Sequence, residues 1–165
     1  MKQIAFIGVG VMGKSMVRNL MKSGYEVSIF TRTKEKVLDV IKEGAQWCED
    51  IKTCVTGKDV VITIVGYPKD VEEVYFGENG ILENSQPGTY VIDMTTTSPQ
   101  LSMKIYEAAR KKQMSALDAP VSGGDIGAQK GTLSIMVGGD REAFEVCQPI
   151  FECLGRSEEH TSELQ

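Results

Sequence analysis

Short apolar runs alternate with amphipathic segments along most of the chain. Residues 3–8 are an apolar run ended by glycine, which is typical of a strand buried on both faces of a parallel sheet. Apolar positions at helical spacing follow as far as residues 23–24, and a second apolar run at 25–30 completes a predicted βαβ unit. The same rhythm predicts further strands at 46–48, 60–65, 90–93, 114–117 and 133–137 and further helices at 34–42, 50–55, 71–75, 99–112 and 141–154. This alternation predicts an α/β fold, a doubly wound and mostly parallel sheet covered by helices on both faces.

The last ten residues depart from this pattern. Residues 156–165 are polar, show no periodicity and contain His160, the single histidine. One possible set of codons for them, AGATCGGAAGAGCACACGTCTGAACTCCAG, resembles a common short-read sequencing-library adapter. We therefore predict one domain over residues 1–155 and a non-native tail over 156–165, with a frayed polar terminus as the alternative. If the tail is read-through, no histidine-based triad or metal site is expected in the chain.

The amino-acid composition mainly excludes certain classes of function. The 165 residues are 41% hydrophobic and 25% charged with a net charge of −5, which argues against disorder and against nucleic-acid binding and favours a small-molecule ligand. No apolar run approaches the roughly 20 residues of a membrane span, and the start of the chain lacks the features of a signal peptide, so a cytoplasmic location is expected. Four cysteines without a C-x-x-C pair are expected to be buried thiols in a reducing compartment: Cys48, Cys54, Cys147 and Cys153.

A glycine motif stands between the first predicted strand and the first predicted helix. Residues 8–13 read Gly8-Val9-Gly10-Val11-Met12-Gly13, which is G-x-G-x-x-G. In this context the first glycine permits a tight turn, the second lets the backbone approach a pyrophosphate, and the third lets helix and strand pack closely. The amides at the start of the helix would then face the phosphates. The motif therefore predicts a Rossmann-type dinucleotide site that includes Gly8, Gly10, Val11, Met12 and Gly13.

The end of the second predicted strand bears on which dinucleotide is bound. An acidic residue at this point hydrogen-bonds the ribose 2′-hydroxyl and disfavours a 2′-phosphate. Here the sequence is Thr31-Arg32-Thr33, followed by Lys34 and Lys36, which offers hydroxyls and cations instead. The pattern favours NADP(H) over NAD(H), although Arg32 also fits a simple solvated surface charge.

Three motifs in order resemble the β-hydroxyacid dehydrogenase family, the 3-hydroxyisobutyrate dehydrogenase-like proteins related to 6-phosphogluconate dehydrogenase. They are the glycine segment F-I-G-V-G-V-M-G at 6–13, D-M-T-T-T-S-P at 93–99, and D-A-P-V-S-G-G at 118–124 with Gly127-Ala128 and Gly131-Thr132-Leu133. The resemblance covers residues 1 to about 155, which makes the chain the N-terminal portion of such a protein. It departs from the family's usual pattern at Thr31, where NADP(H)-preferring members often have asparagine, and at Thr95, where serine is commoner.

The resemblance implies roles for residues that spacing alone does not assign. Thr96 is implied to contact the nicotinamide ribose region, and the loop containing Val65 and Gly66 to pass over the nicotinamide side of the cofactor. Ser122, Gly123 and Gly124 are implied to hold a substrate carboxylate, and hydroxyl and glycine amide donors suit that task.

The resemblance also implies an activity, a hydride transfer between a nicotinamide cofactor and a short β-hydroxy acid or aldehyde acid. The family's G-x-x-x-K-x-x-N motif, which carries the general acid/base lysine, has no match here, so no catalytic residue is assigned. The family's helical second domain, which builds its homo-oligomer, is also absent, so we expect this chain to bind cofactor with little turnover. Two alternatives stay open, a stand-alone regulatory dinucleotide-binding module and an imine-reductase-like member of the same family.

Overall fold

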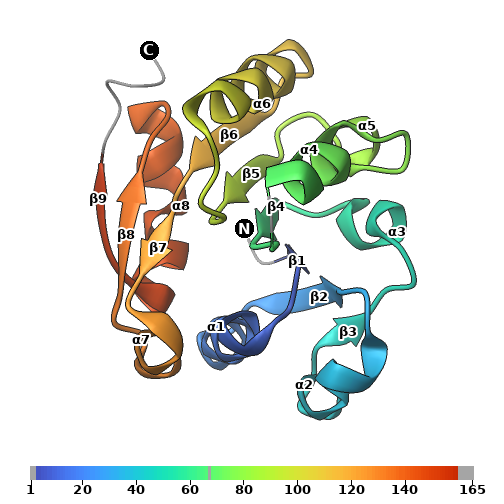
Figure 1. Cartoon of the computed structure of the whole chain (residues 1–165), viewed down its shortest axis with the longest axis vertical. Helices are drawn as coiled ribbons and strands as arrows, with labels where there is room; N and C mark the ends of the chain where they lie inside the picture. Colours follow the sequence, from blue (N-terminus) through green and yellow to red (C-terminus); the bar gives the residue numbers. More distant parts are fainter. Residues whose placement is uncertain (1–2, 67, 160–165) are drawn as a thin grey trace.

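The main sheet confirms the predicted doubly wound fold. In the computed structural model, which describes residues 3–66 and 68–159, six parallel strands are arranged in the order β3-β2-β1-β4-β5-β6 (Figure 1). The strands are β1 (Gln3–Ile7), β2 (Glu26–Phe30), β3 (Gln46–Trp47), β4 (Val60–Thr63), β5 (Tyr90–Asp93) and β6 (Ser115–Asp118). The chain therefore crosses from one half of the sheet to the other between β3 and β4, and this order creates a crevice at the carboxyl ends of the central strands.

Alternation along the strands explains why helices cover both faces. In β1, Ile4 and Phe6 point into one buried cluster, whereas Ala5 and Ile7 point into the other. Helices α1, α2, α7 and α8 close the first cluster and α3, α4, α5 and α6 close the second. These helices are α1 (Val11–Lys22), α2 (Leu38–Lys42), α3 (Ile51–Val55), α4 (Pro68–Phe76), α5 (Ile81–Asn84), α6 (Pro99–Lys111), α7 (Gly124–Lys130) and α8 (Arg141–Leu154).

The structure differs from the predicted elements mainly where segments are short. Residues 34–42 split into a 3₁₀ turn, Lys34–Val37, and α2. Helix α5 and helix α7 were not predicted, because four residues of α5 give no period and α7 contains two glycines, which weaken any helical pattern. Close packing against its neighbours explains α7: a Cβ on Gly127 would lie 3.2 Å from Leu133, and Asn19 of α1 donates a 2.8 Å hydrogen bond to the Ala128 carbonyl.

A second, three-stranded sheet lies beside the main one. It consists of β7 (Val121–Ser122), β8 (Leu133–Val137) and β9 (Gly155–Glu159), with β8 in the middle (Figure 1). The strand expected at 133–137 is present, but it belongs to this sheet, and among the described residues an isolated bridge between Asp118 and Gly138, just past the end of β8, links the two sheets. The alternation of the sequence gave no sign of this division.

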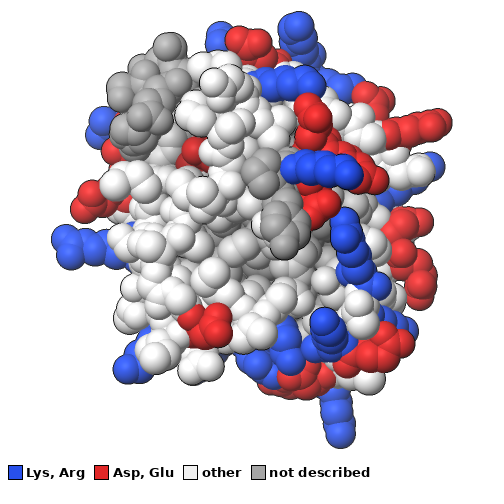
Figure 2. Space-filling view, in the orientation of Figure 1, with Lys and Arg blue, Asp and Glu red and all other residues white. Residues whose placement is uncertain are grey.

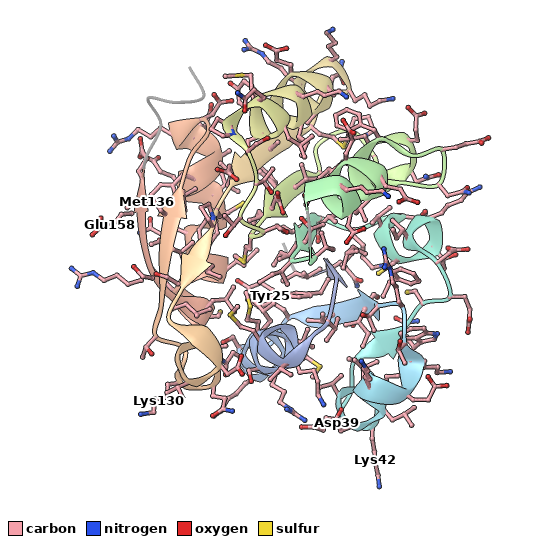
Figure 3. The ribbon with its side chains drawn as sticks, in the orientation of Figure 1. Tyr25, Asp39, Lys42, Lys130, Met136 and Glu158 are labelled. Atoms are coloured by element: carbon pink, nitrogen blue, oxygen red, sulfur yellow. The ribbon has the colours of Figure 1, made fainter. Side chains whose placement is uncertain are left out.

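A strand continues past the domain boundary predicted at residue 155. Residues 156–159 still pair in parallel with β8, and Met136 and Glu158 face each other in this register (Figure 3). Strand pairing uses backbone groups that almost every residue carries, and none of the β9 side chains is fully buried. The pairing extends the fold to Glu159, while the non-native origin of residues 156–165 stays a prediction and His160 lies outside the described residues.

Candidate cofactor-binding site

The turn between β1 and α1 has a separate steric reason for each of its glycines. Gly8 has a φ of +93°, and a Cβ there would collide with the carbonyl oxygen of Ile64. A Cβ on Gly13 would lie 3.1 Å from the Gly8 carbonyl oxygen, so Gly13 lets α1 approach the end of β1. A Cβ on Gly10 would meet no atom within 4 Å. Gly10 thus faces open space, which is the space that the second glycine of a G-x-G-x-x-G motif leaves for a pyrophosphate.

The start of α1 presents unused backbone donors to that space. Gly10 is the N-cap of the helix, no side chain among the described residues caps it, and its first turn contains no acidic residue. The first amides of a helix have no partners inside the helix and lie at the positive end of its dipole. The residues present therefore fit an anionic phosphate group at this helix end.

A groove of about 420 Å³ opens at the carboxyl ends of β1, β2 and β4. Strand β1 lies between β2 and β4, so the groove marks the point at which the strand order reverses. Charged side chains of both signs crowd the side of the visible face that carries α2, α3 and α4, whereas the area over β7 and α1 is mostly uncharged (Figure 2). Seven of the predicted cofactor-binding residues line the groove: Gly8, Gly10, Thr31, Arg32, Thr33, Val65 and Gly66.

The other predicted cofactor residues lie outside the groove lining. The Val11 side chain is 68% exposed, Met12 is half-buried against the core, and Gly13 is buried in the turn. Any contact of these three with a phosphate would use their backbone amides rather than their side chains. Thr96 is exposed in the loop after β5. Contacts of these four residues with a cofactor stay predictions.

The side chain of Arg32 at the end of β2 already has a partner. Its Nη2 lies 3.1 Å from Oδ1 of Asp70, which stands in the first turn of α4. Asp70 is not among the predicted site residues, because nothing local in the sequence indicates that α4 lies across the groove from β2. Of the lysines that follow Arg32, Lys36 lines the groove, whereas the Lys34 ammonium lies 5.7 Å from the centre of the Trp47 ring.

A buried polar network holds the loops at the ends of β4 and β5. The Asp93 carboxylate accepts hydrogen bonds from the Thr95 amide at 3.1 Å, the Thr97 hydroxyl at 2.7 Å and the Thr63 hydroxyl at 2.9 Å. The hydroxyl of Tyr75, a fully buried side chain, lies 2.8 Å from the Thr63 hydroxyl. The D-M-T-T-T-S-P segment is thus built around its aspartate, which fixes the backbone on both sides of the exposed Thr96.

The network also joins the two loops to each other. The Val65 amide donates a 3.0 Å hydrogen bond to the hydroxyl of Thr95. Burial raises the pKa of Asp93 above its ordinary value, and the hydrogen bonds from the three threonines oppose that shift. Burial likewise raises the pKa of Tyr75, with the nearby Asp93 charge acting in the same direction. The network is therefore a scaffold in which each polar group is satisfied by its neighbours.

The residues implied to bind substrate form a separate turn between β7 and α7. Ser122 ends β7 and is exposed, Gly123 has a φ of +127° and Gly124 a φ of +64°. They are not part of the lining of the groove. The turn lies beside the main site, because α7 packs closely along α1 (Figure 1). The structure keeps the three residues together, with Gly123 and Gly124 in conformations that favour glycine, and their binding of a carboxylate stays a prediction.

Other classes of site leave few traces in residues 3–66 and 68–159. Within these ranges no cluster of three or more His, Cys, Asp or Glu side chains is arranged to hold a metal ion. No helix in the described part of the chain combines the length and apolarity that crossing a membrane requires. The cysteines are free thiols, as predicted, with Cys48, Cys54 and Cys147 buried and Cys153 half-buried.

Comparison of the sequence with known families gives one match over nearly the whole chain. Residues 3–162 match the family described as the NAD binding domain of 6-phosphogluconate dehydrogenase. Among curated proteins, the uncharacterized oxidoreductase YkwC of Bacillus subtilis is 58% identical over 94% of this chain and 54% of its own length. The NAD-dependent L-serine dehydrogenase of Pseudomonas aeruginosa is 44% identical over 95% of this chain and 53% of its own. The chain therefore spans about half the length of the curated relatives it matches.

Solved structures give the same result at the level of the fold. A 3-hydroxyisobutyrate dehydrogenase of Mycobacterium tuberculosis, solved with L-serine, superimposes with a TM-score of 0.90 at 32% identity, covering 96% of this chain and 54% of that one. Psf3 in complex with NADP+ and 2-OPP superimposes with a TM-score of 0.92 at 29% identity, covering 98% of this chain and 58% of that one. Dinucleotide-binding proteins of both cofactor types are thus among its relatives.

Proposed function

Because the chain belongs to the family of the NAD binding domain of 6-phosphogluconate dehydrogenase, we propose that it is the NADP(H)-binding part of an oxidoreductase for short β-hydroxy acids or aldehyde acids. One observation supports this most, the open space at Gly10 in front of the uncapped N-terminus of α1, inside a groove at the strand-order reversal. A side chain at Gly10 would occupy that space, so the turn is built as a cradle for a phosphate group.

Different residues of the groove bind different parts of the cofactor. The amides of Val11, Met12 and Gly13 hold the pyrophosphate, and Arg32 with its flanking threonines interacts with the adenosine end. Arg32, Thr33 and Lys36 are the donors that favour a 2′-phosphate, which is the basis for proposing NADP(H). A bound nicotinamide supplies the hydride donor or acceptor.

The loops after β4 and β5 hold the other end of the site. The hydrogen bond from the Val65 amide to Thr95 keeps the two loops together, and the exposed Thr96 contacts the nicotinamide ribose from the loop after β5. The hydroxyl of Ser122 and the amides of Gly123 and Gly124 bind the substrate carboxylate. These residues orient and bind, and none of them is positioned as a general acid or base.

The turnover of residues 1–165 is expected to be slow. The family's lysine motif has no match in this sequence, and general acid/base help typically contributes a factor of about 10² to 10⁴. The proposed oxidoreductase activity and the homo-oligomer therefore belong to the longer proteins of which this chain spans about half. NADPH oxidation with an aldehyde acid at the rate of an intact enzyme by residues 1–165 would overturn this part of the proposal.

A parallel titration tests the cofactor assignment. The fluorescence of NADPH and of NADH is followed as protein is added at one fixed salt concentration, and tighter binding of NADPH is expected. Tighter binding of NADH would overturn the preference but leave the dinucleotide site standing. Binding of neither by a protein with a folded circular dichroism spectrum would show that the glycine turn is only a turn.

A further inference from the structure

The ion pair between Arg32 and Asp70 crosses the adenosine end of the groove. Arg32 comes from the loop after β2 and Asp70 from the first turn of α4, 38 positions later in the sequence, and the two side chains meet at 3.1 Å. Asp70 is also close to the loop after β4, since a Cβ on Gly66 would lie 3.9 Å from Asp70 Oδ2. The Arg32 side chain is 80% exposed and that of Asp70 only 20%, so the carboxylate is the more fixed partner and the guanidinium the more mobile one.

The pair lies where two cavities meet. Arg32 and Asp70 both line the main groove and also a second cavity of about 380 Å³ next to it. Among the described residues, the charged lining of the main groove is two cations, Arg32 and Lys36, and one carboxylate, Asp70. The charged lining of the second cavity is one cation and three carboxylates, because Glu73 and Glu78 join Asp70 there. The carboxylates that are absent from the end of β2 are thus supplied by α4 and the segment that follows it.

We propose that Asp70 is a specificity-determining residue that sets the balance between NADPH and NADH through its ion pair with Arg32, an inference that rests on the proposed dinucleotide site. A 2′-phosphate needs the Arg32 guanidinium and is repelled by the Asp70 carboxylate, so NADPH binding has to weaken the pair. A 2′-hydroxyl carries no charge and leaves the pair intact. Asp70 therefore acts as the acidic residue that the end of β2 lacks, and it makes the preference for NADPH smaller than Arg32 alone would give.

The inference is tested by the ratio of NADPH to NADH affinity in the variant Asp70→Asn. We expect NADPH affinity to rise about tenfold and NADH affinity to change less than about twofold, because only the charged phosphate senses the carboxylate. The gain is expected to shrink as salt is raised, since screening weakens charge interactions at this partly exposed site. Asp70→Ser is measured as well, because serine removes the charge but keeps a polar side chain at the same position.

Two further variants separate the charge effect from a general disturbance of α4. Glu72→Gln removes a carboxylate from the same helix, where Glu72 pairs with Lys104 away from both cavities, and is expected to leave the ratio unchanged. In an Arg32→Gln background, Asp70→Asn is expected to raise NADPH affinity by less than it does in the wild type, because no guanidinium is released. Thermal unfolding of every variant monitors the fold.

The outcomes distinguish this inference from the proposed function. If the wild-type protein binds dinucleotide but neither Asp70 variant changes the ratio of NADPH to NADH affinity, the role of Asp70 is overturned and the binding function stands. If Glu72→Gln changes the affinity ratio as much as the Asp70 variants do, the role of Asp70 is also overturned, because the effect would then not depend on the ion pair with Arg32. A wild type that prefers NADH, with a ratio that shifts toward NADPH in both Asp70 variants, supports the inference and corrects only the cofactor preference. A folded wild type that binds neither cofactor overturns both.

Discussion

Two glycine turns in this molecule each lead from a strand into a helix, and they are held in different ways. The turn from β1 into α1 is enclosed by the central strands, with Gly8 directly against the backbone of Ile64. The turn from β7 into α7 lies at the edge of the small sheet, and a Cβ on Gly124 would meet no atom within 4 Å. The first turn leaves no room for a side chain at Gly8, whereas the second is less confined: a Cβ on Gly123 would lie 3.4 Å from Leu133.

The helices that follow show the same difference. Helix α1 has 12 residues and buries one face containing Met16, Val17 and Leu20, whereas α7 has 7 residues and buries only Gly127 and Ala128. A longer helix with a large apolar face sets the direction of its first amides firmly. The comparison teaches that two glycine-rich turns can differ in rigidity, because the elements that pack around them from outside differ in size and burial.

Gly8→Ala is expected to give the largest effect. A methyl group would collide with the Ile64 carbonyl and would also be held at a φ of +93°, so the free energy of unfolding should fall by about 3 kcal/mol or more and dinucleotide binding should be lost. Urea unfolding followed by circular dichroism measures the change. Gly24→Ala is the matched control, because Gly24 has a φ of +99° but open space around it. Equal stability losses in the two variants would contradict the packing argument.

Gly10→Ala is expected to separate binding from stability. The φ of Gly10 is −86° and nothing lies near its missing Cβ, so the free energy of unfolding should change by less than about 1 kcal/mol. NADPH affinity should fall at least about tenfold, because the methyl group would enter the space left for the phosphates. Fluorescence titration and urea unfolding on the same sample check both halves. An unchanged affinity would mean that the phosphates do not lie at this turn.

The Asp93 network predicts a pH dependence of stability. The pKa of Asp93 is higher in the folded protein than its ordinary value, because burial disfavours the charged carboxylate. The folded state therefore binds the proton more tightly than the unfolded state, and stability falls as pH rises from about 4 through the folded pKa. Asp93→Asn should lack this slope and should differ from the wild type by about 1 kcal/mol through its altered hydrogen bonds.

Urea unfolding of both proteins across the range from about pH 4 to 7 tests this expectation. A wild-type curve that runs parallel to that of Asp93→Asn would contradict it, because another group would then be responsible for the slope. Thr97→Val removes a 2.7 Å hydrogen bond that lowers the pKa of Asp93, so in this variant the slope should extend to higher pH than in the wild type.

Gly124→Ala is expected to give the smallest effect. Its φ of +64° costs an alanine roughly 1 kcal/mol, but there is room for the methyl group. NADPH affinity should stay within about twofold of the wild type, because the β7–α7 turn does not line the groove. A large loss of NADPH affinity would mean that the β7–α7 turn also belongs to the dinucleotide site, and the contrast between the two turns would not hold.

The sequence predicted most of the groove lining at the ends of β1 and β2, because those signals are local. The glycine motif lies within residues 8–13 and the polar end of β2 within residues 31–33, so each signal can be recognised in a short stretch of sequence. The βαβ rhythm then places both stretches at the same edge of the sheet. Tyr75 and Thr63 could not be assigned to the Asp93 network in this way. Their side chains meet only because β4 and β5 are neighbours and α4 packs across them.

The sequence by itself determined the order of strands and helices, the doubly wound sheet and the position of the dinucleotide motif, because burial periodicity and glycine spacing are encoded over a few residues. Only the tertiary structure decided that β8 leaves the main sheet, that residues 156–159 pair with it, and that Asp70 meets Arg32. These outcomes depend on which distant segments become neighbours. The packing of the whole sheet sets those neighbours, and no short stretch of sequence contains that information.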